Sequence, residues 1–174
     1  INYSIVTNID KEHIDYYKNY QNLENSFVKF INKTPPIGKS IICTDDKKIK
    51  VLQKKITIKN YLTYGFNKNS DYQIINPFYN ANSCKFDLII KNFSGKKKIV
   101  KNFILNLIGK YNILNSVAAI GVCLNIGIKI DIIKKALKKF TGVQRRMTKV
   151  FEKNKNEFYD DYAHHPTEIL SVLE

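Results

Sequence analysis

Strand-like and helix-like patterns alternate over residues 1–65, and this alternation limits the possible folds more than any other feature of the chain. The short apolar runs have the length of buried strands and lie at residues 3–7, 40–44 and 61–64. Tyr20–Asn32 instead carries apolar side chains at helical spacing, namely Leu23, Phe27, Phe30 and Ile31. Residues 45–54 predict a second helix. Such an alternation predicts an α/β fold.

Residues 71–105 have a different character, because they are rich in Ile, Phe, Tyr and Val. Turn-forming residues interrupt them at Asn80-Ala81-Asn82 and Ser94-Gly95, which predicts an antiparallel sheet attached to the α/β core. Two paired helices are then expected, at residues 112–126 and 131–140. Gly142 marks a domain boundary, so we expect one domain over residues 1–142 and another over residues 143–174.

The segment 160–168, Asp-Asp-Tyr-Ala-His-His-Pro-Thr-Glu, concentrates carboxylates, a phenol and two imidazoles. The residues before it, 156–159, predict a strand, and Pro166 begins a helix, since proline is tolerated in a first helical turn. Ligands of α/β folds usually bind at such strand-to-helix junctions. The segment therefore predicts a binding or catalytic site, with a simple capped loop as the alternative.

Segment 160–168 resembles a signature of the Mur ligases, the ATP-dependent amide-forming enzymes of peptidoglycan synthesis. Further stretches are similar to motifs of that family in the same order, at residues 8–17, 109–119 and 140–147. They read NIDKEHIDYY, GKYNILNSVAA and FTGVQRRM. The resemblance implies a Mur-ligase-type central ATP-binding domain with an additional antiparallel sheet, followed by the start of a Rossmann-like C-terminal domain.

The family's central domain begins with a glycine-rich phosphate loop, and this chain has no such loop. Gly38-Lys39-Ser40 has the ending of that motif but lacks the preceding glycine at the required spacing. We therefore expect the chain to be a piece of a larger protein and not to catalyse alone.

The resemblance also implies roles for single residues. His13 would help to hold Mg²⁺ near the nucleotide phosphates and take part in catalysis. The residues that would bind ATP are Asn112, Asn115, Arg146 and Asp161, of which Arg146 and Asp161 are also expected to be catalytic once the C-terminal domain closes. The residues expected near the amino-acid substrate are Tyr162, His164 and His165.

Without the family resemblance, these residues also allow purely structural interpretations. His13 lies among carboxylates, as surface histidines often do, and Asn112 and Asn115 have the spacing of helix-capping residues. Arg145-Arg146 is also typical of a solvated basic patch. His164 and His165 are adjacent and point in different directions if the chain is extended, so we do not expect both to touch one ligand.

Some positions depart from the family pattern. The departures are Glu12 for Asp, Tyr111 for His, Thr148 for an acidic residue and Ala163 for Gly. Tyr111 leaves an aromatic face that can stack on a purine. Some Mur ligases use a carbamylated lysine on the Tyr20–Asn32 helix, and we do not assign Lys29 that role because the alanine-adding branch does not need one.

The implied reaction joins L-alanine to UDP-N-acetylmuramate through an acyl phosphate made with ATP. Asp10, residues 15–17 and Glu168 favour this alanine-adding branch, whereas Ala163 favours the recycling branch, which adds a tripeptide to the same nucleotide sugar. A non-catalytic, lysine-rich binding module is an alternative from another class.

The formal net charge of +14 comes from 29 basic and 15 acidic residues. Lysine supplies nearly all of it, and arginine, with its phosphate-binding fork, occurs only at Arg145 and Arg146. We attribute this excess to an AT-rich coding composition and expect no nucleic-acid partner. No apolar run is long enough to cross a bilayer, and the scattered Cys43, Cys84 and Cys123 indicate reduced thiols. We expect a cytoplasmic protein.

Overall fold

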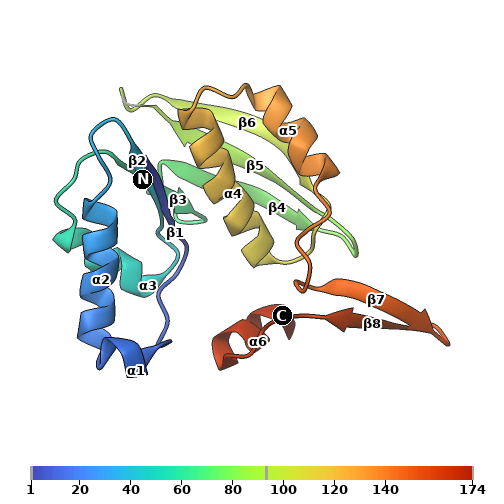
Figure 1. The fold of residues 1–174 in the computed structure, drawn as a ribbon. Coiled ribbons are helices and arrows are strands. Elements are labelled where there is room, and N and C mark those ends of the chain that lie inside the picture. Colours follow the sequence, from blue (N-terminus) through green and yellow to red (C-terminus); the bar gives the residue numbers. More distant parts are fainter. Residues whose placement is uncertain (1, 93, 174) are drawn as a thin grey trace.

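One main sheet organises the computed structural model, which describes residues 2–92 and 94–173 (Figure 1). The sheet has six strands in the order β1-β2-β3-β4-β5-β6. They are β1 Tyr3–Val6, β2 Lys39–Cys43, β3 Tyr61–Gly65, β4 Tyr72–Tyr79, β5 Cys84–Lys91 and β6 Lys97–Leu105. Neighbours pair in parallel from β1 to β4 and antiparallel from β4 to β6. The antiparallel strands predicted over residues 71–105 are therefore confirmed, and they continue the parallel strands in one sheet.

The two kinds of strand have different burial patterns. Ser40 to Cys43 of β2 are all buried, as expected for a parallel strand with structure packed on both faces. In β5 the burial alternates, with Cys84 and Phe86 buried and Lys85 exposed between them. Alternation of this kind leaves one face of an antiparallel sheet in contact with solvent.

Helices lie on both sides of the parallel strands (Figure 1). Their bounds are α1 Ile14–Tyr17, α2 Tyr20–Asn32, α3 Lys47–Leu52, α4 Lys110–Asn125, α5 Ile130–Lys139 and α6 Pro166–Leu173. Helices α4 and α5 cover one face, and α2 and α3 lie on the opposite side of β1 to β3 (Figure 1). The predicted helices are confirmed with ends shifted by a few residues, whereas the short α1 was not predicted.

Helix α4 supplies much of the core. The side chains of its residues Ile113, Val117 and Ile120 are almost completely buried. Gly121 allows the helix to approach β2, since a Cβ atom there would lie 3.1 Å from Cδ1 of Ile41. This packing fixes where α4 begins, at the edge of the sheet where β6 ends.

A separate two-stranded ribbon follows α5 and consists of β7 Thr148–Lys153 and β8 Asn156–Asp160. Asn154 and Lys155 form its turn, with φ angles of 53° and 66°. The strand predicted at residues 156–159 and the helix beginning at Pro166 are confirmed, whereas β7 was not predicted. No residue of the ribbon is buried.

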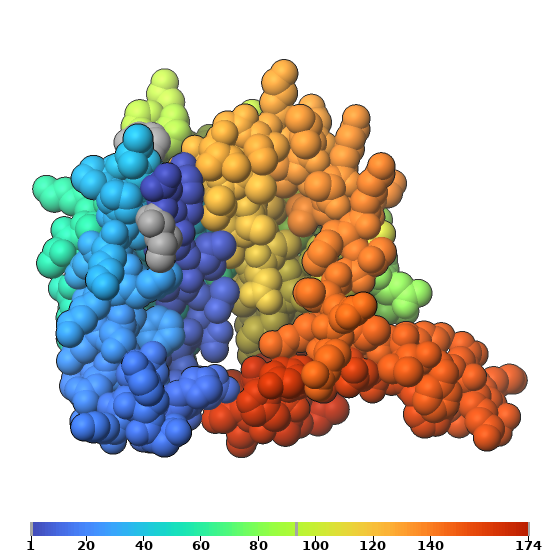
Figure 2. Space-filling view, viewed as in Figure 1, coloured from blue at the N-terminus to red at the C-terminus, as the bar shows by residue number. Residues whose placement is uncertain are grey.

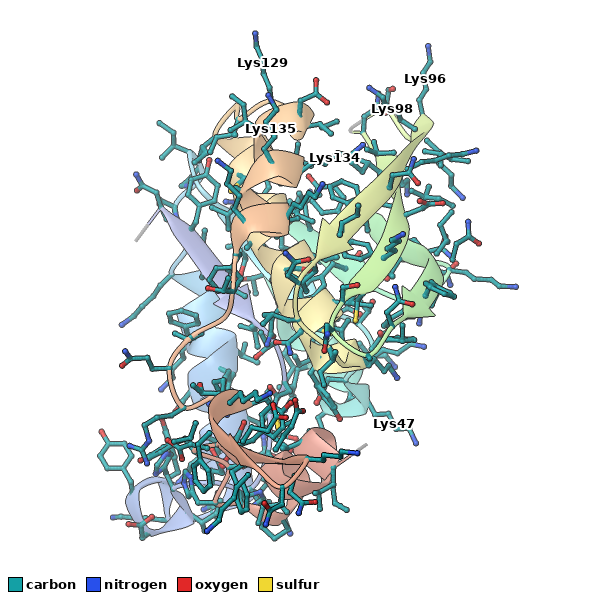
Figure 3. The ribbon with its side chains drawn as sticks, turned by 90° about the vertical axis from the view of Figure 1, so that its right-hand side faces the viewer. Lys47, Lys96, Lys98, Lys129, Lys134 and Lys135 are labelled. Carbon is teal, nitrogen blue, oxygen red and sulfur yellow. The ribbon has the colours of Figure 1, made fainter. Side chains whose placement is uncertain are left out.

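No helix in the described parts of the chain is both long and apolar enough to cross a membrane. A group of lysines lies at one end of the molecule, on α5 with its preceding loop and on the β5–β6 hairpin. It comprises Lys96, Lys98, Lys129, Lys134 and Lys135, whereas Lys47 projects from the other end (Figure 3).

Candidate active site

The parallel strands end at one edge of the sheet, and two of the segments expected to carry site residues begin there. The segment after β1 carries Asp10 and His13, and α4 begins at the same edge because β6 runs parallel to β1. The Lys110 ammonium lies 5.4 Å from the centre of the Phe66 ring, which joins the start of α4 to the loop after β3. Ligands of α/β proteins usually bind at this edge.

His13 has a strained backbone. It is the residue before α1, with φ 54° and ψ 34°, and its carbonyl accepts hydrogen bonds from Tyr16 and Tyr17 at 3.0 Å each. Left-handed angles are uncommon for residues other than glycine, and such strain concentrates at functional sites. The His13 side chain is exposed, so the imidazole is available to a ligand.

The described residues do not form a magnesium site by themselves. Across residues 2–92 and 94–173, no group of three or more His, Cys, Asp or Glu side chains could hold a metal ion. Magnesium prefers oxygen ligands in octahedral geometry, so the imidazole of His13 can be at most one of several ligands.

Two adjacent carboxylates hold the loops of this edge together, and the sequence interpretation missed both. Asp46 accepts the Ile49 amide at 2.8 Å, which caps α3, and the Ile9 amide at 3.4 Å. Asp45 accepts the amides of Phe66 at 2.8 Å and Asn67 at 3.1 Å. These bonds connect the loops after β1, β2 and β3. Acidic residues immediately after a strand were the signal for this role.

Asn112 and Asn115 lie in the first turns of α4, but they do not cap it. The N-cap residue is Gly109, and the Asn112 side chain donates to the Ile108 carbonyl at 2.7 Å. Asn115 and the neighbouring Tyr111 are exposed. The capping interpretation is therefore wrong. Within the described chain, no hydrogen bond or ion pair joins these asparagines to the segment 145–168.

Asp161 fixes the local shape of the chain between the ribbon and α6. Its carboxylate accepts the Met147 amide at 2.8 Å and the Ala163 amide at 2.7 Å. The guanidinium of Arg145 stacks 4.6 Å from the centre of the Tyr162 ring. Arg146 is exposed. The two arginines thus have different surroundings, which their sequence context did not distinguish.

The adjacent histidines contact different partners, as their extended spacing predicted. His164 Nδ1 lies 2.9 Å from the Tyr162 carbonyl oxygen and 3.5 Å from the Glu168 carboxylate. His165 Nδ1 accepts the Thr167 amide at 3.4 Å and lies 3.8 Å from Oδ2 of Asp10. His165 therefore faces the segment after β1, and His164 does not.

Asp10 lies where the segment after β1 meets the residues at the start of α6. Figure 2 shows the C-terminal segment against the N-terminal one at this end of the molecule. Asp10 Oδ1 accepts the Lys11 amide at 2.7 Å and lies 3.5 Å from the Lys48 ammonium. The pKa of the Asp10 carboxyl lies below its usual value, chiefly because the Thr167 side chain hydrogen-bonds it; Lys48 and His165 lower it further, against the effect of burial.

Comparison with known proteins places the chain in a family. The model of the family described as "Mur ligase middle domain" matches residues 1–123 of the chain. The chain belongs to the Mur ligase family. The family resemblance drawn from the sequence motifs is thereby confirmed, together with the predicted α/β fold class.

Among curated Mur ligases, the UDP-N-acetylmuramate–L-alanine ligase of Pelagibacter ubique is 52% identical over 98% of this chain. The chain spans 37% of the length of that relative. A crystal structure of UDP-N-acetylmuramate-alanine ligase from Thermotoga maritima matches 99% of the chain and 37% of its own, with a TM-score of 0.74 and 25% identity. MurF from Acinetobacter baumannii matches 98% of the chain and 36% of its own, with a TM-score of 0.79; at 20% identity it supports the fold alone.

Proposed function

We propose that the protein containing this chain joins L-alanine to UDP-N-acetylmuramate with ATP, in peptidoglycan synthesis. The observation that carries the proposal is the 52% identity, over 98% of the chain, to a ligase with that name. The contact between Asp10 and His165 supports it, because it brings together two of the segments that carry the family resemblance. Since ATP is a cytoplasmic metabolite, the proposal includes a cytoplasmic location.

The proposed reaction has two chemical steps. The carboxylate of UDP-N-acetylmuramate attacks the γ-phosphorus of ATP, ADP leaves, and an acyl phosphate forms. The amine of L-alanine then attacks the acyl carbon, loses a proton, and phosphate departs. Such a sequence requires that water be kept from the acyl phosphate, a task for domain closure.

We assign the nucleotide to Asn112, Asn115, Arg146 and Asp161, and the amino acid to Tyr162, His164 and His165. The exposed side chains of Asn115 and Arg146 are free to reach a ligand. A guanidinium suits bidentate contact with phosphate oxygens, and it offsets charge on a phosphoryl group in transfer. Asp161 contributes by holding Met147 and Ala163, which shapes the chain on either side of Tyr162.

The proposal retains His13 as a ligand to Mg²⁺, which would neutralise phosphate charge in the complete protein. The further ligands would be supplied in the complete protein, and the roles of the remaining residues do not depend on the ion. We also retain residues 1–142 and 143–174 as central and C-terminal domains. In support of that division, Gly142 has a φ angle of 99° and stands between α5 and the separate ribbon.

The test measures ADP release by the full-length protein with UDP-N-acetylmuramate and one of two amine substrates. Turnover with L-alanine supports the proposal. Turnover only with the L-Ala-γ-D-Glu-diamino-acid tripeptide would assign the protein to the recycling branch, which Ala163 favours. Folded protein that turns over neither substrate would contradict both activities and favour a non-catalytic binding module.

The neighbouring arginines provide a matched pair of variants for the same assay. Arg146→Ala is expected to lower kcat/KM by about 10²-fold, the usual effect of removing one group that stabilises transition-state charge. Arg145→Ala removes the stacking on Tyr162 and is expected to have a smaller effect on the reaction with ATP. Equal effects of the two substitutions would contradict the assignment of Arg146 to the nucleotide.

A further inference from the structure

Asp10 receives contacts from three separate parts of the chain. Its own segment after β1 supplies the Lys11 amide, α3 supplies the Lys48 ammonium, and the start of α6 supplies His165 and Thr167. These elements are far apart in the sequence. A carboxylate with such surroundings fixes their relative positions.

Each of these contacts is weak on its own. An exposed ion pair contributes little, and the 3.5 Å and 3.8 Å separations at Asp10 are long for a charged hydrogen bond. They act on the same carboxylate, however, and the side chains of Asp10 and His165 retain only 22% and 26% of their exposure. Partial burial reduces the screening by water, so the charge of Asp10 acts on all four partners together.

The contacts also determine how His165 is held. Its Nδ1 atom accepts the Thr167 amide at 3.4 Å, and its carbonyl accepts the Ile169 amide at 2.9 Å in the first turn of α6. Asp10 faces this same turn through His165 and Thr167. A shift of Asp10 therefore changes the orientation of the imidazole and of the residues directly before α6.

We propose that Asp10 is a positioning residue that fixes the first turn of α6, and with it His164 and His165, against the segment that carries His13. The inference rests on the proposed function for its consequence: Asp10 sets the affinity for L-alanine without touching it. Lys48 assists by holding the carboxylate from α3.

Substitutions at Asp10 separate its charge from its hydrogen bonds. Asp10→Asn keeps an oxygen for Thr167 and Lys11 but removes the charge, and Asp10→Ala removes both. In the full-length protein, Asp10→Ala is expected to raise KM for L-alanine about tenfold, within the usual range of coupling between sites. Asp10→Asn should raise it less, and Asp10→Glu should restore most of the affinity. KM for ATP should stay near the wild-type value.

Adjacent lysines on α3 supply the control. Lys48→Gln removes a partner of Asp10 and should raise KM for L-alanine, whereas Lys47, which projects into solvent, should tolerate the same substitution (Figure 3). Thermal unfolding of every variant tests folding separately from positioning. Equal kinetics for Lys48→Gln and Lys47→Gln would remove Lys48 from the proposal.

Hydrogen exchange at the amides of Thr167 and Ile169 tests the positioning without any turnover. Asp10→Asn should speed exchange at these amides relative to Lys47→Gln, and Thr167→Val should add little to Asp10→Ala because the two variants break the same contact. If wild-type protein lacks both ligase activities, the proposed function fails while exchange still decides the role of Asp10. Wild-type exchange rates and KM values in Asp10→Asn would overturn the inference.

Discussion

Two stacked phenylalanine pairs show how differently the main sheet and the β7–β8 ribbon are held together. Phe86 and Phe103 are cross-strand neighbours with ring centres 5.3 Å apart and an interplanar angle of 11°. Phe151 and Phe158 make the same kind of pair, at 4.2 Å and 12°. The first pair is at most 1% exposed, whereas the rings of the second are 51% and 44% exposed.

The difference indicates which half of the candidate site has its geometry fixed by core packing. His13 and the start of α4 belong to a sheet whose strands are fixed by a continuous core. The segment 160–168 follows a two-stranded ribbon without a buried residue, and such a ribbon is marginally stable alone. Polar contacts therefore have to position the second half, and Asp10 provides several of them.

The largest expected effect comes from Phe103→Ala. Truncation of a fully buried phenylalanine removes apolar contacts and leaves a cavity, at a cost of about 3–5 kcal/mol in the free energy of unfolding. Denaturant unfolding monitored by circular dichroism measures it. A loss below about 1 kcal/mol would contradict the view that a rigid core holds the first half of the site.

A smaller effect is expected at Gly65, where β3 ends. Its φ angle is 147°, and a Cβ atom would lie 2.5 Å from Oδ1 of Asp45, the carboxylate that holds the next loop. Gly65→Ala should cost about 1–3 kcal/mol, as backbone strain at a special position does.

Gly95→Ala is the matched control for that substitution. Gly95 also has a positive φ angle, 79°, but a Cβ atom there would meet nothing within 4 Å among the described residues. Gly95→Ala should therefore reduce the free energy of unfolding by less than Gly65→Ala does in the same denaturant experiment. Equal losses would mean that the close contact with Asp45 is unimportant.

Phe151→Ala is expected to cost no more than about 1 kcal/mol, because its ring is half exposed and its pair lies outside the core. The change should be local: faster amide exchange in β7 and β8, with the unfolding of the main sheet unchanged. A loss as large as that of Phe103→Ala would show that the ribbon and the sheet form one cooperative unit.

Most of the fold was predictable, because burial on one or both faces leaves a clear period in the sequence. The helix over Tyr20–Asn32 and the α/β alternation show this. Strand β7 was missed since Thr148–Lys153 contacts no core and its mostly exposed side chains carry no burial pattern. Helix α1 is a single turn, too short for any period, and the left-handed backbone of His13 leaves no mark in composition.

The candidate site was predictable only in part. The family motifs located His13 and the segment 160–168, but motifs name residues without their contacts. They therefore gave no sign that Arg145, and not Arg146, stacks on Tyr162, or that Asp10 faces His165. Such contacts depend on how the chain after Gly142 returns to the sheet, which no local pattern records.

The smallest expected effect is that the stability of the first turn of α6 depends on pH. The pKa of Asp10 is lower in the folded protein than its ordinary value of about 3.9, so its stabilising contribution is complete above that value. It is lost as the pH falls through the lower pKa of the folded state. The Thr167 amide chemical shift should titrate accordingly at acidic pH, with Lys48 and His165 as the basic side chains that face the carboxylate.

In Asp10→Asn the same titration should disappear. A Thr167 shift that still follows the wild-type curve in this variant would assign the titration to another group.

Native-state hydrogen exchange of the whole protein tests the central claim most directly. Amides of β2 should exchange only through global unfolding, whereas those of β8 and the first turn of α6 should exchange through smaller local openings. The Asp10→Asn substitution should reduce the second free energy and leave the first unchanged. A single free energy of exchange for β2, β8 and α6, with no response to Asp10→Asn, would contradict the account.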